Sequence, residues 1–145
     1  MMTINFVVGF DGSKASEAAV RFAVKQAQTC DATLIIAHVL EWSPYSFLTP
    51  TEIEERHARR NMELKRAKEA LIDPLLEKIK SEVGAVESVI RYGNIVDTII
   101  AISKDSDAAQ IFIGRTGHRG VASRVFGSVA GSLAQHASVP VTIIP

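Results

Sequence analysis

The segment from Gly114 to Ser128, GRTGHRGVASRVFGS, combines glycines with arginines and a histidine in a pattern suited to anion binding. It lies between the short apolar run 111–113 and an alanine-rich stretch that is typical of a helix. Glycine lacks a Cβ, so Gly114 and Gly117 can adopt positive φ and let a ligand come within contact distance of the main chain. Gly127 and Ser128 then open the helix, whose first N–H groups have no intrahelical acceptor. Those amides, the helix dipole and the Ser128 hydroxyl predict an anion pocket, most naturally for phosphate.

The same spacing fits a simpler structure, in which the glycines only reverse the chain and Ser128 is an ordinary helix N-cap. Four side chains of the segment carry groups that would neutralise phosphate, although such side chains on loops are usually solvated; they are Arg115, His118, Arg119 and Arg124. Two other phosphate motifs are excluded by their spacing, since GFDGSK has its glycines three apart and GRTGHRG does not match GxGxxG. The missing loop lysine and Mg²⁺ carboxylate argue against an efficient P-loop NTPase.

The elements that must position this segment alternate between strand and helix. Short apolar runs rich in β-branched residues predict five strands, at 4–10, 33–40, 86–92, 111–113 and 139–144. Helical patterns separate them, starting near Ser13, at Thr51, after Asn94 and at Ser128. This alternation predicts an α/β domain with an open parallel sheet and helices on both faces.

The second helical region carries two local signals. Thr51 and Glu54 have the spacing of a capping box, so we expect the helix to begin there. Asp73-Pro74 interrupts the pattern further on and predicts either a kink or a new helix start with proline in its first turn.

Composition sets the broad class of protein. With 145 residues, 47% of them hydrophobic and 22% charged, the chain is expected to form one domain over residues 1–145. A formal net charge of zero gives no bulk electrostatic reason to bind nucleic acid or an anionic membrane. The start of the sequence has no leader pattern, and no run is long enough to span a bilayer. Together with the single Cys30, this predicts a cytoplasmic protein.

The loop fits the pattern G-x2-G-x9-G-[ST] through Gly114, Gly117, Gly127 and Ser128, and the chain resembles the ATP-binding type of universal stress protein. The likeness covers the whole chain, in the stretches FVVGFDGSKASEAAVRFA, LIIAHVL, YGNIVDTIIAIS and GSVAGSLAQHASVPVTIIP. It implies a Rossmann-like fold, close to the adenine nucleotide alpha hydrolases, with strand order 3-2-1-4-5. That order would place the ends of the first and fourth strands side by side.

The resemblance also implies ATP as ligand, with Mg²⁺ bound through its phosphates. Asp11 would accept hydrogen bonds from the ribose hydroxyls, Val39 would contact adenine through its main chain, and Gly9 and Phe10 would form part of the base pocket. Surrounding the phosphates would be Gly114, Arg115, Gly117, His118, Arg119, Gly127, Ser128 and Val129. From the residues alone, Asp11 fits equally well an Asx turn that caps the first helix. His38 fits a packed strand residue better than a ligand.

The resemblance further implies a homodimer through the last strand, Val139 to Ile144, whose apolar edge would otherwise be left unpaired. We expect a nucleotide-dependent regulatory or stress-response protein, because the sequence shows no plainly placed catalytic base. Two alternatives remain: a slow ATPase or phosphotransferase that uses His118 or an arginine, and a nucleotide-free dimeric scaffold.

Overall fold

The structure is a computed structural model of the chain and describes residues 3–41, 49–116 and 128–145. One parallel sheet organises it, with five strands in the order β3-β2-β1-β4-β5. The strands are β1 (Asn5–Gly9), β2 (Thr33–Leu40), β3 (Ala85–Tyr92), β4 (Gln110–Gly114) and β5 (Val141–Ile144). The expected α/β class and the strand order 3-2-1-4-5 are therefore confirmed.

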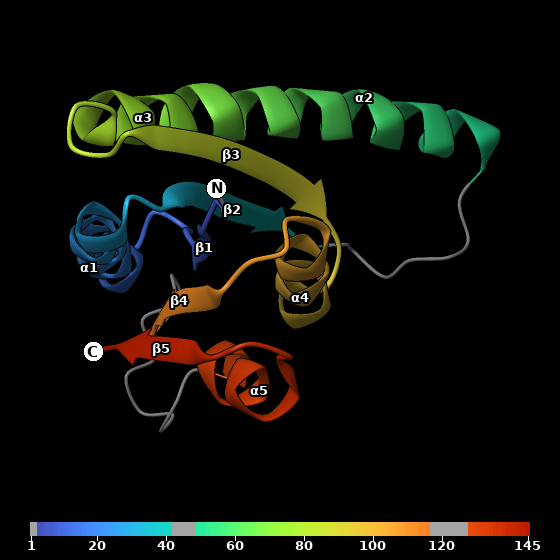
Figure 1. The fold of residues 1–145 in the computed structure, drawn as a ribbon. Coiled ribbons are helices and arrows are strands. Elements are labelled where there is room, and N and C mark those ends of the chain that lie inside the picture. The colour runs from blue at the N-terminus through green and yellow to red at the C-terminus, as the bar shows by residue number, and fades with distance from the viewer. Residues whose placement is uncertain (1–2, 42–48, 117–127) are drawn as a thin grey trace.

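Helices cover both faces of the sheet (Figure 1). They are α1 (Lys14–Cys30), α2 (Pro50–Ala67), the π-helix η1 (Lys68–Ile72), α3 (Asp73–Ile79), α4 (Ile95–Asp105) and α5 (Ser128–His136). One core cluster joins β-strand side chains such as Val8 and Ile36 to α1, η1 and α3. The other joins Val7 and Ile35 to α4 and α5. Successive residues of β1 and β2 thus enter opposite cores, which explains why these strands are apolar without alternation.

Helix α1 packs closely on the sheet because its inward side chains are small. Ala19, Ala23 and Ala27 are all buried against strands of the first core. The helix starts at a side-chain cap, where the Ser13 hydroxyl accepts a hydrogen bond from the Ser16 amide over 3.1 Å. The entry to α1, and with it the turn after β1, is therefore fixed locally.

The start of α2 corrects one expectation. The capping box is made by Thr49 and Glu52, not by Thr51 and Glu54: the Glu52 amide donates to Thr49 Oγ1 over 3.2 Å, and the Thr49 amide donates to the Glu52 carboxylate. Pro50 occupies the first helical turn, where its fixed φ suits a helix and its missing N–H costs nothing. Thr51 therefore lies inside the helix.

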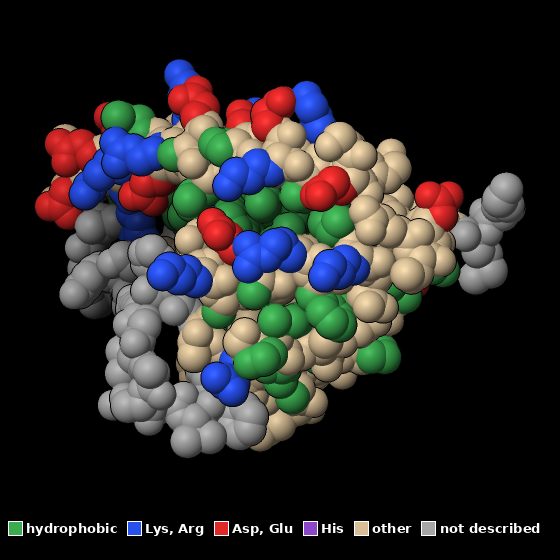
Figure 2. Space-filling model, turned by 90° about the vertical axis from the view of Figure 1, so that its left-hand side faces the viewer, with side chains coloured by type: hydrophobic (Ala, Val, Ile, Leu, Met, Phe, Trp, Pro, Cys, Tyr) green, Lys and Arg blue, Asp and Glu red, His purple; other side chains and the backbone are tan. Residues whose placement is uncertain are grey.

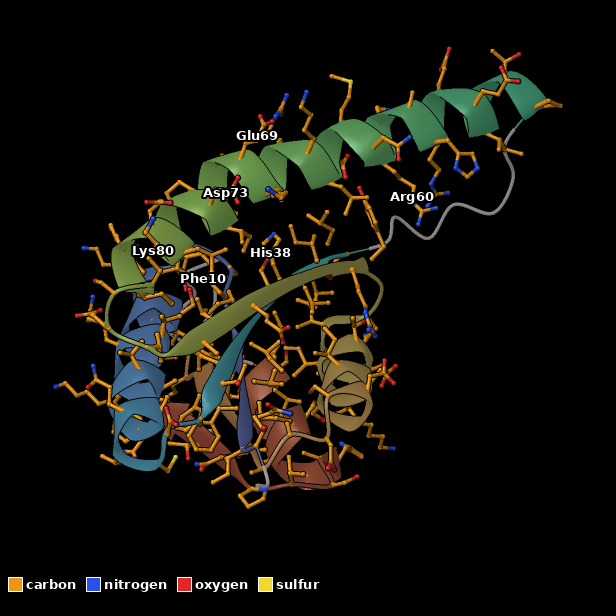
Figure 3. All side chains as sticks on the ribbon, turned by 45° about the horizontal axis from the view of Figure 1, so that its top comes forward. Phe10, His38, Arg60, Glu69, Asp73 and Lys80 are labelled. Atoms are coloured by element: carbon orange, nitrogen blue, oxygen red, sulfur yellow. The ribbon has the colours of Figure 1, made fainter. Side chains whose placement is uncertain are left out.

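The Asp73-Pro74 interruption is accommodated without ending the helix. The chain stays helical from α2 through η1 into α3, and the π-helical turn ends just before Asp73. Pro74 lacks the N–H of a regular helix and crowds the preceding turn, and a π turn is one way to relieve both. The N-terminal part of α2 extends beyond the sheet, as Figures 1 and 3 show.

Candidate functional site

The carboxyl ends of β1 and β4 lie side by side in the middle of the sheet. The two strands pair in parallel, with Val8 opposite Phe112. From β1 the chain crosses through α1 to β2 on one side, and from β4 it crosses through α5 to β5 on the other. This reversal of direction is the place where ligands bind in open α/β sheets.

The turn after β1 is an Asx turn. Asp11 Oδ1 accepts a hydrogen bond from the Ser13 amide over 2.9 Å, and the Asp11 amide is bonded to Ser16 Oγ over 3.3 Å. Gly12 between them has φ +84°, a conformation that L side chains rarely adopt. Asp11 is half-buried, and its carboxylate lies at the carboxyl edge of the sheet. The turn places Asp11 directly after β1, at the edge of the sheet where a ligand is expected.

The last residue of β4, Gly114, must be glycine for a reason that the sequence did not reveal. We expected a glycine that can adopt positive φ beside a ligand, but the positive-φ glycines of the described segments are Gly12 and Gly93. A Cβ on Gly114 would instead lie 2.8 Å from the backbone carbon of Ala15 and 2.9 Å from its Cβ and carbonyl oxygen. The close approach at this position is that of helix α1 itself.

The residues expected at the base pocket come from adjacent strands. Gly9 is the last residue of β1, and a Cβ there would meet the side chains of Ile113 at 2.5 Å and Ile99 at 3.3 Å. Phe10 is buried in the first core, and its amide donates to the carbonyl of Ala37 over 2.9 Å. Val39, next to this edge on β2, is half-buried and packs against the second core. The three residues are thus gathered at the ends of β1 and β2.

The residues expected at the phosphates are described in part. The Arg115 amide donates to the carbonyl of Ile144 over 2.7 Å, so this main-chain donor is used in pairing with β5, while the residue is exposed. Ser128 is exposed at the first position of α5, and the first amides of an α-helix have no acceptor within the helix. Val129 follows and packs against the second core. Gly117, His118, Arg119 and Gly127 lie outside the described residues.

A polar cluster lies at the end of the edge strand β3, near the same edge of the sheet. The Tyr92 hydroxyl is 2.6 Å from Glu63 Oε2, and the Arg60 guanidinium lies over the ring at 4.6 Å from its centroid. Burial, followed by the hydrogen bond to Glu63, raises the pKa of Tyr92 to about 12. While the Tyr92 hydroxyl keeps its proton, this cluster joins α2 to β3.

Two polar side chains that we had not assigned to the site contact the turn after β1. Ser16 Oγ contacts the Asp11 amide, and His38 Nδ1 lies 2.7 Å from the carbonyl oxygen of Phe10. The first contact is local, since its partners are five residues apart in the sequence. Nothing local in the apolar run around His38 indicated the second, because its partner is 28 residues away.

Two features are absent from the described segments. Within residues 3–41, 49–116 and 128–145, no group of three or more His, Cys, Asp or Glu side chains is placed to hold a metal ion. In the same segments no helix combines the length and apolarity that crossing a membrane requires.

Comparison with known sequences finds relatives across the whole chain. A universal stress protein of Mycolicibacterium smegmatis is 32% identical over 145 residues, which cover 95% of this chain and 47% of the relative. One from Mycobacterium tuberculosis is 30% identical over 155 residues, covering 98% of this chain and 48% of the relative. The chain therefore spans about half the length of the curated relatives it matches.

Solved structures agree with the fold over its full length. UspA from Lactobacillus plantarum has a TM-score of 0.85 at 25% identity, with 100% of this chain and 99% of that chain covered. A universal stress protein from Archaeoglobus fulgidus, solved in complex with dAMP, has a TM-score of 0.69 at 26% identity and full coverage of both chains. The sequence model of the universal stress protein family matches residues 2–145, and the chain belongs to this family.

Proposed function

We propose that the chain binds an adenine nucleotide, with ATP as its ligand, at the carboxyl ends of β1, β2 and β4. The observation that carries this proposal is the placement of the Asp11 turn beside the end of β4, where the direction of the crossovers reverses. The dAMP complex of the Archaeoglobus fulgidus relative supports the same class of ligand.

Each residue has a definite part in the proposed site. Asp11 accepts hydrogen bonds from the ribose hydroxyls, since an ionised carboxylate is an acceptor with two oxygens and several lone-pair sites. Val39 meets the base through its main chain, and Gly9 and Phe10 form the adjoining wall.

The phosphates belong at the end of β4 and the start of α5. Arg115 contributes its guanidinium, because its amide is already bonded to Ile144. The amides of Ser128 and Val129 contribute donors from the first turn of α5, where a helix provides no acceptor for them. The same proposal includes Gly114, Gly117, His118, Arg119 and Gly127. Mg²⁺ enters bound to the phosphates.

Isothermal titration with ATP and with AMP tests the proposal, using Asp11→Asn as the decisive variant. Asparagine keeps an oxygen for the Ser13 amide but removes the charge, so the turn should persist while affinity falls by about tenfold, the value of one charge-assisted hydrogen bond. Asp107→Asn is the control, because Asp107 precedes β4 at the opposite edge and has φ 51°, which asparagine tolerates. Equal ATP affinity in Asp11→Asn and wild type contradicts the placement of the ribose.

The proposed output is regulation of a stress response in the cytoplasm by nucleotide occupancy. The single cysteine, Cys30, is exposed at the end of α1 and suits a reducing compartment. We propose that residues 1–145 form a single domain with this function.

Single-turnover assays with radiolabelled ATP test whether the protein hydrolyses its ligand. Retention of intact ATP on the protein supports regulation, and release of phosphate that His118→Ala abolishes supports an enzyme.

We also propose a homodimer formed through β5. This strand is an edge of the sheet and is short, and its residues Val141, Thr142 and Ile143 are only half-buried. Phe22 on α1 is 40% exposed and lies with its ring centroid 6.0 Å from that of Phe112 on β4. Figure 2 shows hydrophobic side chains gathered below a row of Lys and Arg side chains on the face that includes α1.

Pairing with a second copy would satisfy the free strand edge and cover apolar surface. Sedimentation of wild type beside Ile143→Pro tests this. The Ile111 amide donates to the carbonyl of Pro140 and the Arg115 amide to that of Ile144, so in this parallel register Ile143 directs its N–H to the outer edge, where proline removes a donor. We expect a dimer for wild type and a monomer for Ile143→Pro. A wild-type chain that stays monomeric at every concentration contradicts the proposal.

A further inference from the structure

One peptide group at the end of β1 is held on both of its sides by side chains. Its carbonyl oxygen, that of Phe10, lies 2.7 Å from His38 Nδ1, and its N–H, that of Asp11, is bonded to Ser16 Oγ over 3.3 Å. We call this arrangement the peptide clamp. Figure 3 shows His38 and Phe10 between the sheet and the helical layer of α2, η1 and α3.

The clamp uses buried polar groups. In the described part of the chain the buried polar side chains are Ser16, His38, Thr98 and Ser103, and His38 and Ser16 are only 7% and 5% exposed. A polar group is costly to bury unless it is hydrogen-bonded, and a bond shielded from water keeps its geometry. That two of these four side chains hold the same peptide indicates a site whose orientation matters.

The hydrogen bonds define the state of both side chains. A carbonyl oxygen accepts only, so Nδ1 of His38 carries the proton and donates to Phe10. The Ser16 hydroxyl accepts from the Asp11 amide and donates its own proton to the Ser13 carbonyl over 2.9 Å. Each partner in the clamp is therefore matched as donor and acceptor.

The clamp also changes the hydrogen bonding between β1 and β2. The Phe10 amide donates to Ala37, as in a regular parallel ladder, and the next bond of that ladder would join the Phe10 carbonyl to the amide of Val39. In the described structure the recorded partner of this carbonyl is the His38 ring. The main chain of Val39 therefore faces the end of β1, where the adenine of the proposed nucleotide lies.

We infer that His38 and Ser16 are positioning residues for nucleotide binding: by fixing the Phe10–Asp11 peptide they orient the Asp11 carboxylate and leave the Val39 main chain to the base. This inference rests on the proposed function, because it assigns a role to residues that do not touch the ligand. Neither side chain is exposed at the carboxyl edge, and both act through the peptide that they hold.

Titration of the 145-residue chain with MgATP, beside thermal unfolding, tests the inference. His38→Leu fills most of the space without a donor and should weaken ATP binding by about tenfold, the effect expected when a buried carbonyl loses its partner. His38→Asn places an N–H near the position of Nδ1 and should recover most of the affinity even where the smaller side chain lowers the melting temperature. Ser103→Ala is the matched control, since it removes a buried hydroxyl bonded to Ile100 within α4, and should bind ATP as wild type does.

A double-mutant cycle sharpens the result. If His38 and Ser16 hold one peptide, Ser16→Ala should weaken binding severalfold alone and add little to His38→Leu. Wild-type affinity in His38→Leu, or equal losses in the Leu and Asn variants, would overturn the inference while the proposed function stands. Should wild type bind no adenine nucleotide, the proposed function fails, and amide exchange then decides the clamp: faster exchange at Asp11 in His38→Leu supports it, and unchanged exchange refutes it.

Discussion

Replacing Gly114 with alanine should destabilise the fold, whatever its effect on binding. A Cβ at this position would lie 2.8–2.9 Å from backbone and Cβ atoms of Ala15, whereas ordinary contacts begin at 3.4 Å. Helix α1 would have to move by about half an ångström, and it is held by its Ser13 cap and by the buried side chains Ala19 and Ala23. The clash is with main chain, so no rotamer change can relieve it.

Overpacking of this kind costs about 1–3 kcal/mol. In a chain of this length each kcal/mol lowers the melting temperature by about 2–4 °C, so Gly114→Ala should melt about 2–12 °C below wild type. Thermal unfolding followed by circular dichroism measures this. Gly84→Ala is the matched control: Gly84 is exposed, and the nearest atom to a new Cβ is Asp31 Oδ1 at an ordinary 3.4 Å.

We expect Gly84→Ala to melt at the wild-type temperature or slightly above it, because alanine reduces the freedom of the unfolded chain. The reasoning is refuted if Gly114→Ala and Gly84→Ala melt together. A confirmed loss of stability would also mean that a binding defect in a Gly114 variant does not by itself identify a ligand site.

Three further predictions concern local interactions. Burial and the bond to Glu63 raise the pKa of Tyr92 from its ordinary 10.0 to about 12 in the folded chain. The contribution of this raised pKa to stability is therefore complete below pH 10 and is lost as the pH rises toward 12. Denaturant unfolding should show this pH-dependent part in wild type and not in Tyr92→Phe. Thr49→Ala should speed amide exchange in the first turn of α2 and Thr51→Ala should not, since Thr49 provides the cap. Faster exchange in Thr51→Ala alone would contradict a cap at Thr49 and favour one at Thr51. Asn94→Ala should cost about 1 kcal/mol in urea unfolding because it removes the 3.0 Å cap to Asp97, and an unchanged midpoint would contradict that.

The sheet was predictable from the sequence because its strands are buried on both faces. Continuous apolar runs such as the one in β2 have few alternatives at that length, and the helical stretches between them require parallel crossovers. The exact ends of the strands were predicted less closely than the presence of the strands. The last strand begins at Val141 instead of Val139, and the carbonyl of Pro140 accepts from Ile111 just before the strand starts.

The site was predictable where the signal is local. Asp11 followed by Gly12-Ser13 indicated a turn, and the structure confirms the Asx turn that we had considered beside the ribose contact. The reason for Gly114 was not local, because it lies in a contact with Ala15 of a different element. His38 was expected to be packed in a strand, which its burial confirms, but its bond to Phe10 depends on the pairing of β1 with β2.

The most direct test of the proposed site is a titration of ¹⁵N-labelled protein with MgATP, followed by the backbone amide signals. We predict saturable shifts concentrated at Gly12, Val39, Ser128 and Val129, which surround the carboxyl ends of β1, β2 and β4, with the amides of Asp31 and Ala85 at the opposite edge unchanged. An absence of saturable shifts, or shifts centred on that opposite edge, would contradict the account.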